Sequence, residues 1–224
     1  YQPWTGGGIH FSFLNQPQAA ERNFRMFCTA LLPLLDSHNE QTEKLQKVLD
    51  DFHQVMQAKM IKMWSAKLGM EKFNAEIFNE LMTLMMENTV DYTIFFRELS
   101  HIPDDVTPLT KSFYDETVLK PNVLEKFSSW YEKWKEHVDS SSKSLEELRE
   151  QMKAINPKYT LREWILVPAY KAAEQGDYSL LKELQRVMSN PYDENTKEIE
   201  EKYYREKPAE LFDIAGVSHI SCSS

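Results

Sequence analysis

The sequence has little cysteine and little of the patterning that marks secreted, membrane or nucleic-acid-binding proteins. Only two of its 224 residues are cysteine, so it lacks the paired cysteines that stabilise small secreted domains. A mean hydropathy of −0.56 and the lack of any long uncharged apolar run argue against a membrane span. The net charge of −9 disfavours a nucleic-acid surface, because phosphate binding needs clustered Lys and Arg. We therefore expect an intracellular protein that binds neither nucleic acid nor membrane.

Common catalytic and metal-binding motifs are also missing. The six histidines are scattered, with no His-Glu-x-x-His pair and no spacing that brings a hydroxyl to an imidazole. The glycines at 6–8 are followed by no Gly-Lys-Ser/Thr, which argues against a phosphate-binding loop. His219 and Cys222 have a spacing that suits two metal ligands, but a structural zinc site needs four. No metal site is therefore predicted.

Apolar residues at helical spacing are abundant. Hydrophobic residues make up 42% and aromatic residues 12% of the chain, which is enough to form a core. Helices are predicted over residues 17–35, 39–68, 73–88, 90–99, 109–119, 122–138 and 144–152, with a helical hairpin over 156–194. The sequence therefore predicts a mainly α protein.

Residues that start, stop or interrupt helices refine these limits. Ser144 and Glu147 have the spacing of a capping box, and Gly69 is expected to end the long second helix. Pro168 lies inside the hairpin's first helix and is expected to kink or break it. The charge-dense residues 197–207 are expected to form a solvated helical face.

The two cysteines have different predicted environments. Cys28 shares a helical face with Phe24, Phe27, Leu31 and Leu35, so we expect a small core residue. Cys222 lies third from the C-terminus, near a histidine. Its thiol could be accessible and activated, or it could be an inert tail cysteine.

Several short runs, which we term the motif runs, resemble the selenoprotein O (SelO/YdiU) family in their order. The motif runs are Asn15-Gln16-Pro17 with Asn23, Lys67-Leu68-Gly69-Met70, Asp91-Tyr92-Thr93 with Phe95-Phe96-Arg97 and Leu99-Ser100, Asn156-Pro157-Lys158-Tyr159 with Leu161-Arg162, Ala172-Ala173-Glu174 with Gly176-Asp177-Tyr178-Ser179, Pro191-Tyr192-Asp193-Glu194, and Ser221-Cys222-Ser223-Ser224. Together they extend from about residue 7 to residue 224.

This resemblance implies a protein adenylyltransferase. Such a pseudokinase-like enzyme transfers AMP from ATP, with Mg²⁺, to Ser, Thr or Tyr hydroxyls of protein substrates. The family's Gly-rich lobe, its Lys and Glu, its Asp-Asn pair and its Asp-Tyr-Gly metal motif have no counterpart in this chain. The resemblance thus implies that the catalytic, ATP and Mg²⁺ sites lie upstream, with no catalytic, cofactor or metal residue here. It suggests mitochondria for a eukaryotic member and cytoplasm for a bacterial one.

The resemblance also suggests a domain organisation. The fold class expected is mainly α, as the helical C-terminal part of a larger protein-kinase-like (α+β) fold. Residues 1–139 would form late C-lobe helices, residues 143–207 a family-specific hairpin and charged helix, and residues 208–224 a flexible tail. Cys222 occupies the position at which many eukaryotic members carry selenocysteine, so the family implies a redox role for it.

Two alternatives to the enzyme remain open. The chain could be a non-catalytic helical interaction module, since the ATP-binding motifs are missing from it. A thiol oxidoreductase that uses Cys222 alone is disfavoured, because no Cys-x-x-Cys or resolving cysteine is present. The sequence carries no signal for an oligomeric state.

Overall fold

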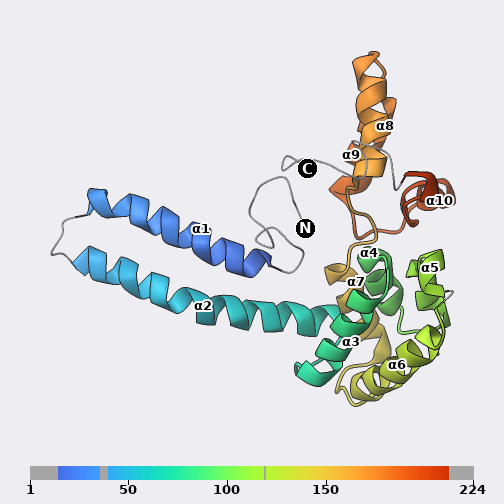
Figure 1. The fold of residues 1–224 in the computed structure, drawn as a ribbon, viewed down its shortest axis with the longest axis horizontal. Coiled ribbons are helices and arrows are strands. Elements are labelled where there is room, and N and C mark those ends of the chain that lie inside the picture. The colour runs from blue at the N-terminus through green and yellow to red at the C-terminus, as the bar shows by residue number, and fades with distance from the viewer. Residues whose placement is uncertain (1–14, 36–39, 119, 212–224) are drawn as a thin grey trace. The chain divides into compact units, whose positions relative to one another are not determined.

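The computed structural model describes residues 15–35, 40–118 and 120–211, and these residues are mainly α (Figure 1). No strand is found among them, and their β pairing is limited to an isolated antiparallel bridge between Val90 and Phe113. This confirms the predicted fold class. The chain divides between Lys62 and Met63 into two compact units.

The first unit is a pair of helices. It contains α1 (Gln16–Leu31), the short 3₁₀ helix η3 (Leu32–Leu34) and most of α2 (Glu40–Lys67). The rings of Phe24 and Phe52 stack with centroids 4.9 Å apart and join the two helices. Cys28 is fully buried (0% exposed), which confirms its assignment to the core.

The prediction for the apolar face of α1 is partly wrong. Phe27 was expected beside Cys28 in the core, but its side chain is 59% exposed. Successive helical residues differ by about 100° in direction, so Phe27 and Cys28 point to different sides of α1. A single neighbouring helix covers only one of those sides.

The second unit contains the remaining helices. They are the end of α2, α3 (Ala75–Glu87), α4 (Tyr92–Leu99), η4 (Thr107–Ser112), α5 (Asp115–Val118), α6 (Val123–Asp139), α7 (Leu145–Ile155), α8 (Glu163–Glu174), α9 (Ser179–Ser189), α10 (Lys197–Tyr203) and η5 (Ala209–Leu211). None of the helices in the described ranges is long and apolar enough to span a membrane.

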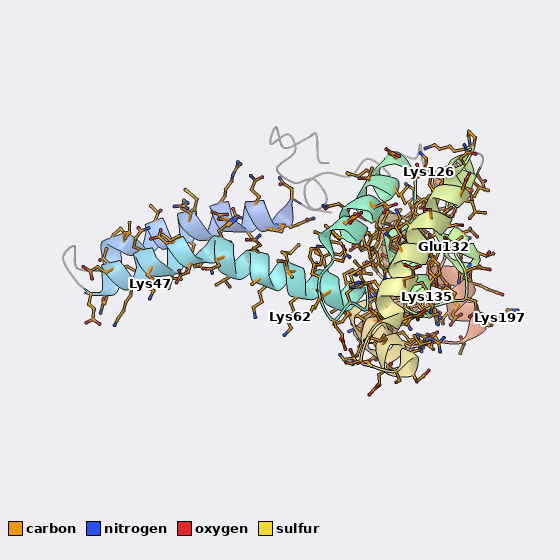
Figure 2. All side chains as sticks on the ribbon, turned by 90° about the horizontal axis from the view of Figure 1, so that it is seen from below. Lys47, Lys62, Lys126, Glu132, Lys135 and Lys197 are labelled. Carbon is orange, nitrogen blue, oxygen red and sulfur yellow. The ribbon has the colours of Figure 1, made fainter. Side chains whose placement is uncertain are left out.

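Two tryptophans of α6 form the centre of this unit. Trp130 and Trp134 are fully buried, and their indole N–H groups donate to the backbone carbonyl oxygens of Ile77 and Leu68, each at 2.9 Å. These acceptors satisfy the polar N–H groups of two large apolar side chains, so both can be buried without an unpaired donor. Charged residues of α6, including Lys126 and Glu132, point outward (Figure 2).

The expected helix over residues 109–119 is interrupted. The 3₁₀ helix η4 ends at Ser112, and Phe113 has extended backbone angles of φ −94° and ψ 118°. Phe113 forms the bridge with Val90 and is buried, and α5 begins only at Asp115. Tertiary packing of Phe113 therefore overrides the local helical pattern.

The predicted hairpin is present as α8 and α9, which pack side by side (Figure 1). Gly176, at φ +85°, forms the turn between them, a conformation that favours glycine. Pro168 does not break α8, which runs without interruption from Glu163 to Glu174. Proline removes one backbone hydrogen bond, and burial of Ile165 and Ala169 on either side holds the helix in place.

The other helix-end predictions have mixed outcomes. The capping box of Ser144 and Glu147 opens α7, and Gly69, at φ +65°, follows the end of α2, so both predictions are confirmed. The charged segment 197–207 is not a solvated face throughout. Its helix ends at Tyr203, and both Tyr203 and Tyr204 are buried, because aromatic residues within the charged run pack on the hairpin core.

Candidate functional site

Residues of the motif runs, far apart in the sequence, meet around α4 in the second unit. Asp91 is the N-cap of α4, where its carboxylate accepts a hydrogen bond from the N–H of Ile94 at 3.0 Å. The same carboxylate receives two hydrogen bonds from the guanidinium of Arg162, one of them 2.8 Å long. Asp91 therefore fixes both the start of α4 and the segment that leads into α8.

Arg97 on α4 is the largest buried charged residue of this cluster, with a side chain only 2% exposed. Its guanidinium donates to the backbone carbonyl oxygens of Lys153 and Asn156, each at 3.2 Å, and to the carboxylate of Glu194 at 2.6 Å. Lys158 also pairs with Glu194, and with Glu200. Arg97 thus joins α4, α7 and the segment that precedes α10.

The environment of Glu194 reflects these contacts. Burial opposes ionisation of its carboxyl group, but hydrogen bonds from Lys158 and Arg97 outweigh that effect and lower its pKa to about 2. The carboxylate is therefore charged at neutral pH and serves as a fixed partner for two cations.

A buried amide links a third set of motif-run residues. The side-chain amide of Asn156 donates to the backbone carbonyl of Lys67 and to the hydroxyl of Ser100, both at 2.9 Å, and accepts from the Lys67 ammonium at 2.7 Å. That ammonium lies 4.8 Å from the ring centroid of Phe96, and burial lowers the pKa of Lys67 to about 8. These groups satisfy one another, which indicates a structural role.

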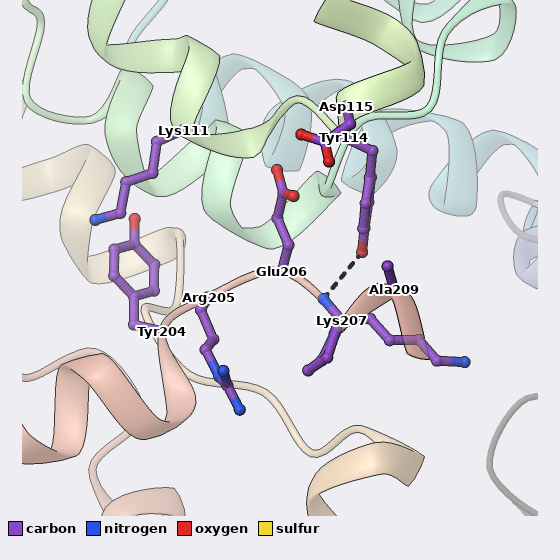
Figure 3. Close-up of a pocket in the computed structure, with 9 residues that line it drawn as sticks. Lys111, Tyr114, Asp115, Tyr204, Arg205, Glu206, Lys207 and Ala209 are labelled. Atoms are coloured by element: carbon purple, nitrogen blue, oxygen red, sulfur yellow. Dashed lines mark hydrogen bonds between the residues drawn. The ribbon is translucent and has the colours of Figure 1, made fainter. Parts of the chain in front are cut away.

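A cavity of about 620 Å³ lies within the same unit (Figure 3). It is lined by Lys111, Tyr114, Asp115, Tyr204, Arg205, Glu206, Lys207, Pro208 and Ala209. Its volume falls in the range of small-molecule pockets, about 300–1,000 Å³. Unlike the buried contacts around Arg97 and Asn156, this cavity offers space that a ligand could enter.

Hydrogen bonds hold the two tyrosine walls of this cavity. The hydroxyl of Tyr114 accepts from the backbone N–H of Lys207 at 3.3 Å, and the hydroxyl of Tyr204 donates to Glu98 at 2.9 Å. Lys111 lies 4.1 Å from the centroid of the Tyr204 ring and pairs with Glu98 at 3.0 Å. The aromatic walls are therefore fixed before any ligand arrives.

Two carboxyl groups, those of Asp115 and Glu206, line the cavity. Figure 3 shows Glu206 pointing toward Asp115, which lies at the start of α5 on the facing wall. Within the described ranges, neither group forms an ion pair or a hydrogen bond through its carboxyl group. Burial, followed by the charges of Asp91 and Asp115, raises the pKa of Glu206 to about 7. Asp115 and Glu206 thus place two acidic groups in a cavity that three basic residues also line.

The residues that the sequence singled out as chemical candidates do not form this cavity. Cys222, His219 and the glycines at 6–8 lie outside the described residues, and Cys28 is buried in the first unit. Among the residues that the structure describes, no group of three or more His, Cys, Asp or Glu side chains could hold a metal ion. Glu206 was taken as one of many solvated charges, because nothing in its local sequence indicates that Asp115 faces it.

Comparison with known proteins agrees with the motif runs. The family model described as protein adenylyltransferase SelO matches residues 7–189. A protein nucleotidyltransferase YdiU of Aromatoleum aromaticum is 33% identical over 99% of this chain and 43% of its own length. The YdiU protein of Flavobacterium johnsoniae is 29% identical over 96% of this chain and 42% of its own length. The chain spans less than half the length of these curated relatives.

The match extends into both described units and covers five of the seven motif runs, but it ends before Glu194, the partner of Arg97. Since the family model accounts for more than half of its residues, the chain belongs to the SelO family of protein adenylyltransferases.

Proposed function

We propose that this chain is the C-terminal helical portion of a protein adenylyltransferase. The full-length protein would transfer AMP from ATP to Ser, Thr or Tyr hydroxyls of protein substrates. The observation that carries this proposal is the family match over residues 7–189. The names of the relatives, which describe protein nucleotidyltransferases, support it.

In this reaction the hydroxyl oxygen of the substrate protein attacks the α-phosphorus of ATP. A new P–O bond forms to that oxygen, the bond to the β-phosphate oxygen breaks, and pyrophosphate leaves while the hydroxyl proton passes to a base. Mg²⁺ would neutralise the phosphate charge. We assign the groups that bind ATP and Mg²⁺ to the part of the protein upstream of this chain.

The contribution of this chain would be structural. In the proposed organisation, residues 1–139 supply late helices of a kinase-like C-lobe, residues 143–207 supply the hairpin and charged helix, and residues 208–224 form a tail. The ion pairs of Arg97 and Arg162 support a scaffold role, because they lock α4 to the segments on either side of the hairpin.

Peptide mapping of full-length protein after incubation with ATP and Mg²⁺ tests this function. The expected result is Ser, Thr or Tyr peptides that carry the mass of AMP. Peptides that carry only the mass of a phosphate would refute it. Complete absence of either adduct would instead favour the non-catalytic helical module.

We further propose that a bacterial protein of this kind acts in the cytoplasm and a eukaryotic one in mitochondria.

We also propose that Cys222 is a redox-responsive element at the position equivalent to selenocysteine. The Cys222→Ser protein should keep its activity under oxidising conditions that change the activity of the wild-type protein. Cys28→Ser is the matched control, because Cys28 is buried and not expected to respond. Equal sensitivity of the wild-type and Cys222→Ser proteins to oxidant would contradict this role.

A further inference from the structure

The cavity of Figure 3 carries an inference that does not depend on AMP transfer. Two acidic residues, Asp115 and Glu206, line it together with three basic residues, Lys111, Arg205 and Lys207.

Two of the basic side chains are engaged outside the centre of the cavity. Lys111 pairs with Glu98 and lies over the ring of Tyr204. Arg205 lies 5.3 Å from the centroid of the Trp164 ring, and Figure 3 shows it pointing away from Glu206. Neither of these two side chains is paired with Asp115 or Glu206, although the charge of Arg162 acts on Glu206.

The carboxyl groups come from separate parts of the fold. Asp115 lies at the start of α5, and Glu206 lies in the segment between α10 and η5. Arg162, whose charge acts on Glu206, forms hydrogen bonds with Asp91. A cation that entered from solvent would therefore meet two carboxyl groups on facing walls and tyrosine rings beside them.

We propose that this cavity binds an alkyl guanidinium group, as presented by an arginine side chain. A guanidinium is planar, can donate to two carboxylates at once and packs against aromatic rings, whereas an ammonium ion is a compact, strongly hydrated charge. The cavity volume of about 620 Å³ accommodates the aliphatic stem as well as the charged group.

The charge state of Glu206 gives this binding a pH dependence. Its pKa is raised to about 7 by burial and by Asp91 and Asp115, while Arg162 acts in the opposite direction. A guanidinium favours the ionised carboxylate, so binding near neutral pH displaces a proton. If only the ionised form binds, affinity should rise about tenfold between pH 6 and pH 8. Tyr114 faces the same cavity, but burial raises the pKa of its hydroxyl group further above this interval.

Isothermal titration of the full-length protein with the capped tripeptide acetyl-Gly-Arg-Gly-amide tests the proposal. The expected result is saturable binding with proton release at pH 7, measured from titrations in two buffers of different ionisation enthalpy. The same peptide with citrulline, a neutral isostere of arginine, should not bind. Equal binding of the citrulline peptide would overturn the proposal.

Variants locate the site. Glu206→Gln and Asp115→Asn should each weaken binding by at least about tenfold, and Glu206→Gln should also abolish proton release. Glu210→Gln, on an exposed carboxyl in η5 that does not line the cavity, is the matched control and should bind normally. Indistinguishable binding by all three variants would overturn the assignment, and Asp115→Asn still tests it if Glu206→Gln does not fold.

Two further probes identify the source of the guanidinium group and test whether the site binds a metal ion instead. Tighter binding of the tripeptide than of agmatine, the free amine with the same guanidinium, indicates an arginine of a protein, while the reverse indicates a small metabolite. Occupation of the acid pair by Ca²⁺ or Mg²⁺ at concentrations at which the tripeptide does not bind would contradict a guanidinium site.

Discussion

The guanidinium of Arg97 donates to the carboxylate of Glu194 at 2.6 Å, although the two residues are 97 positions apart in the sequence. Arg97 is buried and Glu194 is partly exposed, so the pair runs from the core of the second unit to its surface. The same guanidinium also holds the carbonyl oxygens at the end of α7. One side chain thus connects three segments of the fold.

Arg97→Met should destabilise the second unit by about 3 kcal/mol, because it leaves two carbonyl oxygens without their donor and Glu194 with only Lys158 as a partner. Chemical denaturation followed by tryptophan fluorescence measures this, since all the described tryptophans lie in that unit. The control is Lys126→Met, which removes an exposed 3.8 Å ion pair with Glu87 and should change the free energy of unfolding by less than about 1 kcal/mol. Equal effects would show that Arg97 does not join the segments.

Gly69→Ala should destabilise the protein more than Gly176→Ala does. Both glycines have positive φ, so each substitution carries a backbone cost of about 1 kcal/mol or more. A Cβ at Gly69 would also lie 2.6 Å from the sulfur of Met152, which is fully buried, whereas nothing lies within 4 Å of a Cβ at Gly176. Thermal unfolding of the two variants isolates the steric contribution. A larger loss for Gly176→Ala would contradict this packing.

Local signals made part of this fold predictable from the sequence. Ser144 and Glu147 cap α7, and Gly69 follows α2, because capping and left-handed turns depend on residues within a few positions of one another. Phe113 and Phe27 were misplaced for the opposite reason. The position of each depends on which surface is covered by a distant segment, and helical periodicity does not specify that surface.

The candidate site was less predictable than the fold. The motif runs identified Arg97, Arg162 and Glu194 as family features, but not that they meet, because contacts between residues 71 to 97 positions apart arise only from the tertiary structure. The cavity residues Asp115 and Glu206 belong to no motif run. Their proximity follows from the path of the chain after α10.

The pH dependence of stability should separate Glu206 from other carboxyl groups. Its pKa is about 7 in the folded protein, above its ordinary value of 4.5, so the folded state binds the proton more tightly than the unfolded state. The stability that Glu206 contributes is therefore complete below pH 4.5 and is lost as the pH rises through about 7. Denaturation of wild-type and Glu206→Gln proteins between pH 4.5 and 8 measures this difference. An increase in the stability of the wild type relative to Glu206→Gln with rising pH would contradict this prediction.

Glu194 should behave in the opposite way. Its pKa falls from 4.5 to about 2 on folding, because hydrogen bonds from Lys158 and Arg97 outweigh burial. The stability that it contributes is present above pH 4.5 and is lost as the pH falls through about 2. Acid titration followed by circular dichroism should show a shallower loss of stability for Glu194→Gln than for the wild type. An identical acid transition would mean that the ion pairs of Glu194 do not contribute.

The most direct measurement of the proposed activity uses two labels on the same nucleotide. Full-length protein is incubated with Mg²⁺ and a protein substrate, in parallel with ATP labelled at the α-phosphate or at the γ-phosphate. A protein adenylyltransferase leaves only the α label on protein, because the β- and γ-phosphates depart as pyrophosphate. Covalent incorporation of the γ label without the α label would contradict the account.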